Sequence, residues 1–530
     1  MGAGSNRSLA VESAYVVSGD VSPEAIARSL QAVLPSRHRP IVRHRFTVLD
    51  TFDGRVKRAG ARLTRAGVNG SSAMVWQPLN GGRHLTVTLT EPVSFAWDLP
   101  DGPLQQTLAP VIGVRRLLEQ ADAEKFGSLL EILDDRNKTV ARLRIESGRA
   151  RRSVSSDAWQ PLPTVVTLTG LRGYPEAYER LVPVIESRPG IEGCPDGLHG
   201  VMLRQLGAPE PGDASALSLD LPPTVRADVG ARQIHLGLLG ILVANEPGVR
   251  ANLDTEFLHD FRVAVRRTRS LLRQIRNVFP PDAVQHFSTE FAWVGHLTGP
   301  PRDIDVLVLA LRGDQDGFRV GEMGALTAFL GQAQQREHRA LVDALESSRY
   351  RRLLSEWEAF LRRPALCESE AASAGHSLAD VVSRRAWRLS RRIADQAGTV
   401  DDRTTAARLH EVRIAAKKLR YLVDVMPGFY DTADLDRVLG ALKNLQRVLG
   451  DFNDAHGQEE RLVECGLALS ASGGTAGTLL ALGRLAERCR QRKQSLRPEI
   501  AERLARFRAP DTKLSCRRAF KRDGAAERRR

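Results

Sequence analysis

The stretches "HDFRVAVRRTR" (residues 259–269) and "HEVRIAAKKLR" (residues 410–420) share one pattern. Both read His-x-x-Arg-(Val/Ile)-Ala-x-basic-basic-x-Arg, and they begin about 150 residues apart, too far for the short repeats of a solenoid. We therefore predict two related helical units, each built around one copy of this pattern.

Each copy separates into a basic side and an apolar side when it is wound at about 100° per residue. Phe261 and Leu271 fall on the apolar side of the first copy, and Val412 and Leu419 on that of the second. Each basic side starts at the leading histidine, and in the first copy it fills an arc of roughly 80°. The predicted site residues are His259, Arg262, Arg266, Arg269 and Arg273 in the first copy, and His410, Arg413, Lys417 and Arg420 in the second.

The sign of the charges on these basic sides indicates an anionic ligand. A solvated helix face, which is the alternative interpretation, normally mixes signs because like charges at i,i+4 repel. Here nearly every charge is positive, and the same spacing from the histidine recurs in both copies. A bound anion would offset the repulsion, so we predict one kind of site used twice. Further basic residues that extend it are Arg384, Arg385, Arg388, Arg391 and Arg392.

The composition of the 530-residue chain points to a polyanionic partner. Lys and Arg number 77 against 63 Asp and Glu, a formal net charge of +14. Aromatic residues make up only 5%, which weakens interpretations based on base stacking. The five cysteines are scattered and form no C-x-x-C pair, so we predict neither disulfides nor a zinc site.

The apolar segments favour a cytoplasmic protein without membrane insertion. No apolar run reaches the roughly 18–20 residues of a membrane span, and residues 1–17 lack the apolar region of a signal peptide. The most apolar stretch, residues 234–244, is therefore predicted to be a buried core helix. The oligomeric state stays open.

The texture of the chain changes along its length and predicts a multidomain α+β protein. Residues 1–205 contain alternating segments typical of half-buried strands, with helices at 22–34 and 174–187 and a hairpin turn at 134–139. Residues 206–223 are expected to be a linker. Residues 224–510 are predicted to be helical, and 511–530 a basic disordered tail. The predicted fold is an antiparallel β-barrel-like domain followed by an all-α domain of two pseudo-symmetric helical bundles.

Paired acids follow each copy after a glycine break. Asp303 and Asp305 follow the first copy, and Asp451 and Asp454 follow the second. We expect ion pairs that orient neighbouring basic side chains, with a Mg²⁺ or Ca²⁺ site as the alternative. For the two leading histidines we expect a helix-capping or hydrogen-bonding role, since no nucleophile or metal set accompanies them.

The segments "EFLHDFRVAVRRTRSLLR", "PPRDIDVLV", "ARLHEVRIAAKKLRYLVDV" and "LQRVLGDFNDA" resemble the CHAD family, the conserved histidine α-helical domain, over about residues 224–510. The resemblance implies two helical bundles with a basic surface between them that binds inorganic polyphosphate. The nine predicted site residues would then form the binding face, and the protein would reside in the cytoplasm on polyphosphate granules. No cofactor is expected, apart from Mg²⁺ or Ca²⁺ accompanying the polyphosphate. Non-specific nucleic-acid binding by the same face is the alternative.

The stretches "VLDTFDGRVKRAGARLTRAG" (48–67) and "EILDDRNKTVARLRIE" resemble the CYTH, or triphosphate-tunnel, family. The resemblance implies a barrel that binds triphosphate with inward Lys and Arg, while glutamates hold a divalent metal. The family's opening Glu-x-Glu-x-Lys strand should lie in "VESAYVVSG" (11–19), where only Glu12 remains. Because metal-dependent hydrolysis needs these carboxylates, we predict a degenerate barrel without catalysis. A CYTH-type triphosphatase or polyphosphatase is the alternative.

Overall fold

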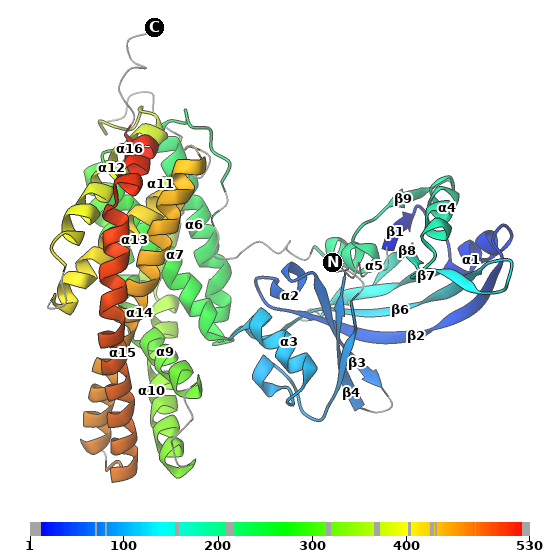
Figure 1. Ribbon diagram of the computed structural model, residues 1–530, viewed down its shortest axis with the longest axis horizontal. Helices are drawn as coiled ribbons and strands as arrows, with labels where there is room; N and C mark the ends of the chain where they lie inside the picture. Colours follow the sequence, from blue (N-terminus) through cyan, green and yellow to red (C-terminus); the bar gives the residue numbers. More distant parts are fainter. Residues whose placement is uncertain are drawn as a thin grey trace, which may run out of the picture. The chain divides into compact units, whose positions relative to one another are not determined.

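The computed structural model of the chain divides into two compact units, Met1–Ala214 and Ser215–Arg530, and each is described by itself (Figure 1). The division falls inside the predicted linker, of which residues 208–216 and 218 lie outside the described residues. The structure describes residues 12–68, 71–79, 82–153, 158–207, 217, 219–313, 320–364, 371–400, 404–424, 429, 432–471 and 473–521.

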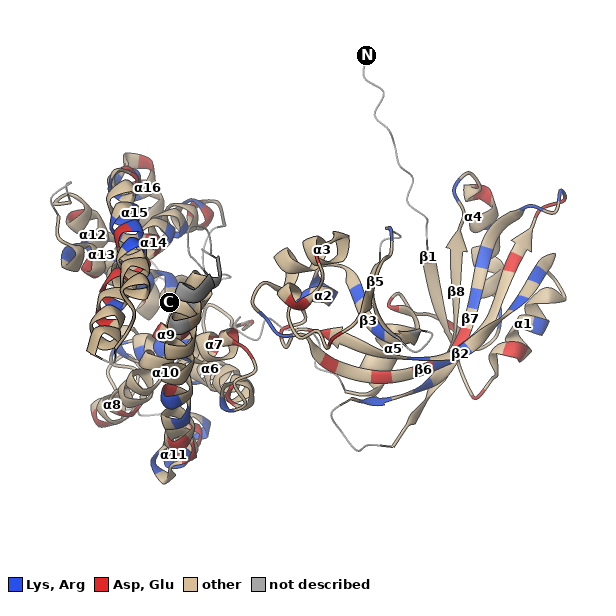
Figure 2. Cartoon of the chain, turned by 90° about the horizontal axis from the view of Figure 1, so that it is seen from below, with Lys and Arg blue, Asp and Glu red and all other residues tan. Residues whose placement is uncertain are grey.

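The first unit is built on one curved sheet of nine antiparallel strands, which confirms the predicted β-rich domain (Figure 2). The strand order is β5-β4-β3-β2-β6-β7-β8-β1-β9, with β5 and β9 at the edges. The predicted hairpin turn joins β6 to β7. The strands are β1 (Glu12–Val17), β2 (Ser36–Asp50), β3 (Ala61–Val68), β4 (Ser71–Pro78), β5 (Leu85–Leu89), β6 (Leu118–Leu133), β7 (Thr139–Arg152), β8 (Gln160–Gly170) and β9 (Ile191–Gly193).

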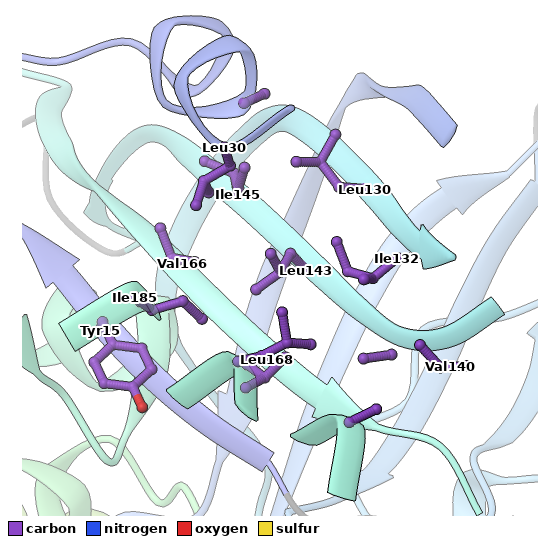
Figure 3. Close-up of a cluster of buried hydrophobic side chains, with 14 of the residues drawn as sticks. Tyr15, Leu30, Leu130, Ile132, Val140, Leu143, Ile145, Val166, Leu168 and Ile185 are labelled. Atoms are coloured by element: carbon purple, nitrogen blue, oxygen red, sulfur yellow. The ribbon is translucent and has the colours of Figure 1, made fainter. Parts of the chain in front are cut away.

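One face of β6, β7 and β8 carries an apolar core under two of the predicted helices, α1 (Pro23–Gln31) and α4 (Pro175–Glu186). Figure 3 shows Leu30 of α1 and Ile185 of α4 in one cluster with Leu143 and Ile145 of β7. The side chain of Ser22 accepts a hydrogen bond from the first turn of α1, as its sequence predicts. Because side chains alternate along a strand, the residues between the core positions of β7 point to the other face.

The opposite face of the sheet is covered by α5 (Gly197–Gln205), which contacts β1, β7 and β8. Its Met202 packs with Ala123 and Leu162 of the sheet. A third core, around Leu63 and Trp76, lies under α3 (Pro103–Ile112) near the short helix α2 (Arg55–Arg58) and the 3₁₀ turn Ala96–Asp98. The N-terminal unit therefore has apolar layers on both faces of its sheet.

The second unit is all-helical, and along the chain its helices form two consecutive groups. The first group is α6 (Ala227–Arg250), α7 (Thr255–Gln274), α8 (Pro281–Leu297), α9 (Gly299–Gly313), α10 (Val320–Glu346) and α11 (Ser348–Arg362). The second group is α12 (Leu378–Ala397), α13 (Ala406–Asp424), α14 (Thr432–Ala471), α15 (Ala476–Arg508) and α16 (Pro510–Phe520). The repeated sequence pattern lies on α7 and α13.

The cores of the helical unit join these groups. In the first group the rings of His235, Phe287 and Phe360 surround Trp357, with centroids 4.5–5.7 Å away. Leucines of α9 and α10 from the first group pack with leucines of α14 and α15 from the second. The two halves of the helical unit therefore share one apolar cluster, and the first half also has an aromatic cluster of its own.

The prediction of a disordered tail over residues 511–530 is wrong for residues 511–520. These residues belong to α16, whose Cys516 and Phe520 side chains are buried. The basic composition of the segment outweighed a short apolar stripe at 516, 519 and 520, which has the i, i+3, i+4 spacing of a helix. Residues 522–530 lie outside the described residues.

Helix α6 contains the apolar stretch 234–244. Among the described residues it is the one helix long and apolar enough to cross a membrane by length and composition, and half of its most apolar window is buried in the structure. Core helices pass the same test. Ile234, Leu238 and Leu242 are buried, as expected for a core helix.

The close approach of α6 and α7 depends on Gly248. A Cβ atom at this position would lie 2.2 Å from Cδ1 of Phe257 on α7. We therefore expect Gly248→Ala to lower the free energy of unfolding by about 1–3 kcal/mol, the usual cost of overpacking. Gly240→Ala in the same helix meets no atom within 4 Å and should be neutral or stabilising by up to about 1 kcal/mol. Urea unfolding of both variants checks the difference, and equal stabilities would contradict it.

Candidate functional site

Helices α7 and α13 carry the two copies of the basic pattern and contact each other. Their apolar sides are buried as predicted, with Phe261 and Leu271 of α7 and Val412 and Leu419 of α13 at 0% exposure. The side chain of Asp254 caps α7 by accepting from the backbone N–H groups of residues 256 and 257. Burial of one side of each helix fixes the direction of its basic side.

The two basic sides meet at Arg266 and Tyr421. Nε of Arg266 donates to the Tyr421 hydroxyl over 2.8 Å, and the guanidinium of Arg267 lies 5.7 Å from the centroid of the tyrosine ring. Burial lowers the pKa values of Arg413 and Lys417, and the nearby charge of Arg266 lowers them further. Cationic side chains from both copies of the pattern therefore lie close together where α7 contacts α13.

A cavity of about 290 Å³ opens at this meeting point. Four cationic side chains and two carboxylates line it, so positive charge is in excess. The lining residues are His259, Asp260, Val263, Arg266 and Arg267 of α7, Lys417, Arg420, Tyr421 and Asp424 of α13, and Gln446 of α14.

Lys417 has a strongly shifted pKa. Its pKa is lowered to about 7, first because the ammonium group is buried and then because Arg266 and Arg413 repel it. Asp454 acts in the opposite direction. Near neutral pH this lysine is therefore poised to gain a proton when an anion approaches.

Two of the predicted arginines lie against α8 instead of the cavity. Arg262 turns toward the end of α8, where Nη1 donates to Thr298 Oγ1 over 3.0 Å and to the Gly295 carbonyl over 3.3 Å. Arg269 also lies against Gly295. Burial lowers the pKa values of both arginines. The structure thus brings His259, Arg266, Lys417 and Arg420 to the cavity, but directs Arg262 and Arg269 toward α8.

Both leading histidines have hydrogen-bond partners, although neither caps a helix. Nδ1 of His259 lies 3.2 Å from Nη2 of Arg302, and Nδ1 of His410 lies 2.6 Å from Oδ1 of Asn453. The capping part of the prediction is wrong because α7 starts at Thr255 and α13 at Ala406, four residues before each histidine. The hydrogen-bonding part is confirmed.

Most of the paired acids contact basic side chains, as predicted. Asp303 lies 3.5 Å from Arg461, Asp451 lies 3.5 Å from Arg447, and Asp454 lies 3.6 Å from Arg413. Asp305 differs, since it accepts a hydrogen bond from the Gln334 amide over 2.6 Å. Of these acids, Asp454 holds a predicted site residue, Arg413.

A second group of cations, which we call the α12 basic cluster, lies at the end of α7 and on α12 and α13. Arg385 and Lys418 are both surrounded by like charges that lower their pKa values, after the larger effect of burial. Among the described residues, no ion pair joins this cluster to an acid. Its members are Arg273, Arg276, Arg385, Arg388, Arg392 and Lys418.

Some residues of the site have no signal in the repeat pattern alone. Arg267 and Lys418 belong to the basic pairs of the pattern, but a helical projection places them beside the basic side. Tyr421 and Gln446 contribute through contacts that only the crossing of α7, α13 and α14 creates. The exception is Asp424, four residues after Arg420, because an i,i+4 pair is visible in the sequence.

An all-helical, duplicated unit with its basic helices in contact defines the structural class of the second unit. The CHAD domain family model matches residues 234–463, so the helical unit of this chain contains a CHAD domain. The nine-stranded antiparallel sheet of the first unit is compatible with a CYTH-like fold.

Three solved structures are similar to parts of this chain. The CHAD domain from the plant Ricinus communis is 26% identical, with a TM-score of 0.47, and the match covers 55% of this chain and 95% of that one. PptA from Streptomyces chartreusis is 18% identical, with a TM-score of 0.40 and coverages of 53% and 100%. The PH1819 protein from Pyrococcus horikoshii OT3 is 11% identical, with a TM-score of 0.20 and coverages of 34% and 93%. A comparison with curated proteins finds no match.

Proposed function

We propose that this protein binds inorganic polyphosphate at the interface of α7 and α13. The observation that supports the proposal most is the meeting of the two duplicated basic helices around one cavity, where cations outnumber acids. The phosphates contact Arg266, Lys417 and Arg420. Arg413 does not line the cavity but adds its positive charge close to Lys417. His259 and His410 hold Arg302 and Asn453 in place near the site.

Polyphosphate suits this surface for physical reasons. It is a flexible chain of closely spaced negative charges without bases, and it needs cations rather than aromatic platforms. Arginine offers forked donors to phosphate oxygens. The repulsion among the clustered cations is relieved on binding, and the release of counterions adds affinity at low salt.

Non-specific nucleic-acid binding is the competing function for the same surface. Among the described residues that line the cavity, Tyr421 is the one Phe, Tyr or Trp, and its contacts with Arg266 and Arg267 leave it poorly placed to stack on a base. We expect polyphosphate to displace labelled single-stranded RNA from the full chain at equal phosphate concentration. Failure to displace it would favour nucleic acid as the ligand.

The α12 basic cluster extends the proposed site and predicts a dependence on polyphosphate length. A short chain fills the cavity alone, whereas a long chain also reaches Arg388 and Arg392. We expect the double variant Arg388→Glu/Arg392→Glu to bind long polyphosphate about tenfold or more weakly, since each lost charged hydrogen bond costs about 1.5–3 kcal/mol. Tripolyphosphate binding should change little. Titrations with polyphosphates of defined length check this, and equal losses for both lengths would contradict it.

We further propose that the chain acts in the cytoplasm as a binding protein that attaches to polyphosphate granules. Mg²⁺ or Ca²⁺ then enters only as the counterion of the polyphosphate. Fluorescently labelled chain should colocalise with polyphosphate stain in cells, and removal of the polyphosphate should disperse it.

A further inference from the structure

The N-terminal unit contains a second charged site, far from α7 and α13 in the sequence. A cavity of about 190 Å³ lies between the sheet and α5. This volume is below the roughly 300–1,000 Å³ of pockets for drug-sized ligands. The charged and imidazole side chains that line it are Glu12 of β1, Arg62 of β3, Lys125 of β6, Arg144 and Glu146 of β7, Asp196 directly before α5, and His199 of α5.

Two polar atoms of this cavity are enclosed without a partner. Among the described residues, neither Nε of Arg62 nor Nδ1 of His199 has a hydrogen-bond partner, and both atoms are buried. Burial of such groups costs free energy unless a partner is supplied. Two unsatisfied groups from β3 and α5 that face one small cavity indicate a ligand with oxygen acceptors.

The charges around the cavity show the sign of this ligand. Burial, aided by Arg144, lowers the pKa of Arg62, and nearby Glu146 and Glu12 oppose this shift. Burial also holds the pKa of His199 well below its usual range, and the charge of Arg62 adds to the effect. An anion would relieve both groups, whereas a cation would add to the repulsion.

A divalent metal, which the CYTH resemblance implies, does not fit these residues. Glu146 is already paired with Lys125 at 3.0 Å, and Glu12 lies within the field of Arg62. Among the described residues, no group of three or more His, Cys, Asp or Glu side chains is placed to hold a metal ion. Carboxylates that compensate neighbouring cations are poor ligands for Mg²⁺, which requires near-octahedral oxygen coordination.

A triphosphate does not fit the charge balance either. The three cations Arg62, Lys125 and Arg144 face the two acids Glu12 and Glu146. The third acid of the lining, Asp196, is paired at 2.5 Å with Arg204, which does not line the cavity, so one net positive charge is left. A triphosphate without its metal would bring several negative charges beside the carboxylates of Glu12 and Glu146. A compact anion of one or two charges is matched better.

We propose that this cavity binds one compact tetrahedral oxyanion of the size of inorganic phosphate, directly and without a metal ion. The donors approach from β3, β7 and α5, and a tetrahedral anion offers acceptors in several directions, whereas a planar carboxylate suits one arginine fork. Arg62 and Arg144 supply the charge, and a neutral His199 adds one hydrogen bond. The inference goes beyond polyphosphate binding by the helical unit and does not depend on it.

The test uses the full chain and inorganic phosphate, titrated by calorimetry at constant ionic strength with chloride as the compensating ion. We expect Arg144→Gln to weaken phosphate binding about tenfold or more. Arg142→Gln is the matched control, because Arg142 lies two residues away on the same strand, is exposed and does not line the cavity. Arg62→Met should abolish the binding. If that variant fails to fold, the half-buried Arg144 decides the question.

Metal and chain length complete the test. EDTA and Mg²⁺ should leave phosphate binding unchanged, and the part of the signal that Arg144→Gln removes should be absent with tripolyphosphate. Equal phosphate binding by Arg144→Gln and Arg142→Gln would overturn the proposal. So would an Arg144-dependent signal that needs Mg²⁺ or prefers tripolyphosphate. Variants of α7 and α13 should leave the Arg144-dependent phosphate signal unchanged. A failure of this proposal can therefore be told apart from a failure of polyphosphate binding by the helical unit.

Discussion

Reversal of two charges, Arg266→Glu together with Lys417→Glu, is expected to weaken polyphosphate binding by about a hundredfold or more. Each substitution removes a charge-assisted contact with a phosphate, worth about 1.5–3 kcal/mol, and puts a repelling carboxylate in its place. Arg266 and Lys417 come from different copies of the repeat and line the same cavity. The variant therefore tests whether the two helices form one site.

The matched control separates this site from the net charge of the protein. Arg336 on α10 and Arg362 on α11 are 73% and 68% exposed, and reversing both changes the net charge by the same amount. We expect this control to bind nearly as the wild type does in moderate salt. Circular dichroism establishes that both variants remain helical. Equal losses of affinity in the two variants would mean that only the overall charge is recognised.

The affinity for polyphosphate is expected to fall as the pH rises from 6 to 8. The pKa of Lys417 is about 7 in the free protein, and a bound anion raises it. Below pH 7 the charge is already present, whereas above pH 7 binding must take up a proton. By linkage the affinity at pH 8 should be about tenfold lower than at pH 6.

Lys417→Arg is the variant that isolates this effect, because arginine keeps its charge throughout the range. The affinity of this variant should not fall between pH 6 and pH 8, unlike that of the wild type. Lys418→Arg, at the neighbouring position, should keep the wild-type dependence on pH. Calorimetry in buffers of different ionisation enthalpy measures the proton uptake directly. A pH profile that Lys417→Arg leaves unchanged would place the titrating group elsewhere.

Local patterns made the helical fold predictable to a large extent. The buried Phe261 and Val412 lie on the sides that a simple helical projection assigns to them, because burial of a continuous apolar stripe determines how a helix faces its neighbours. The prediction of a disordered tail was wrong where a short apolar stripe ending at Phe520 lies within a strongly basic segment and forms part of a helix. Composition averages over such a segment, whereas packing depends on a few positions.

The geometry of the site was only partly predictable, since it depends on how α7 and α13 cross. Spacing in the sequence places Arg262 and Arg266 on one side of α7, but contacts with Thr298 draw Arg262 away from the cavity. The hydroxyl of Tyr421 accepts a hydrogen bond from Arg266, which lies 155 residues away in the sequence. Crossing angles follow from side-chain packing along whole helices, and a repeat pattern does not contain them.

The N-terminal unit shows the limit of a resemblance more clearly. The loss of the opening acidic motif predicted a barrel without metal chemistry, and Glu12, the one acid left of that motif, lines the cavity. The pairing of Glu146 with Lys125 could not be inferred, because it joins neighbouring strands through the register of the sheet. The same register brings Arg144 into the cavity.

The most direct test of polyphosphate binding is a titration of the full chain with polyphosphate of defined length across a salt series. Binding through several phosphate contacts predicts an affinity that falls linearly on a double logarithmic plot, with a slope of about −0.7 to −0.9 per contact. We expect a steep slope for the wild type, and a slope smaller in magnitude by about 1.4–1.8 for Arg266→Glu/Lys417→Glu, which loses two contacts. No binding at low salt, or an unchanged slope in this variant, would contradict the account.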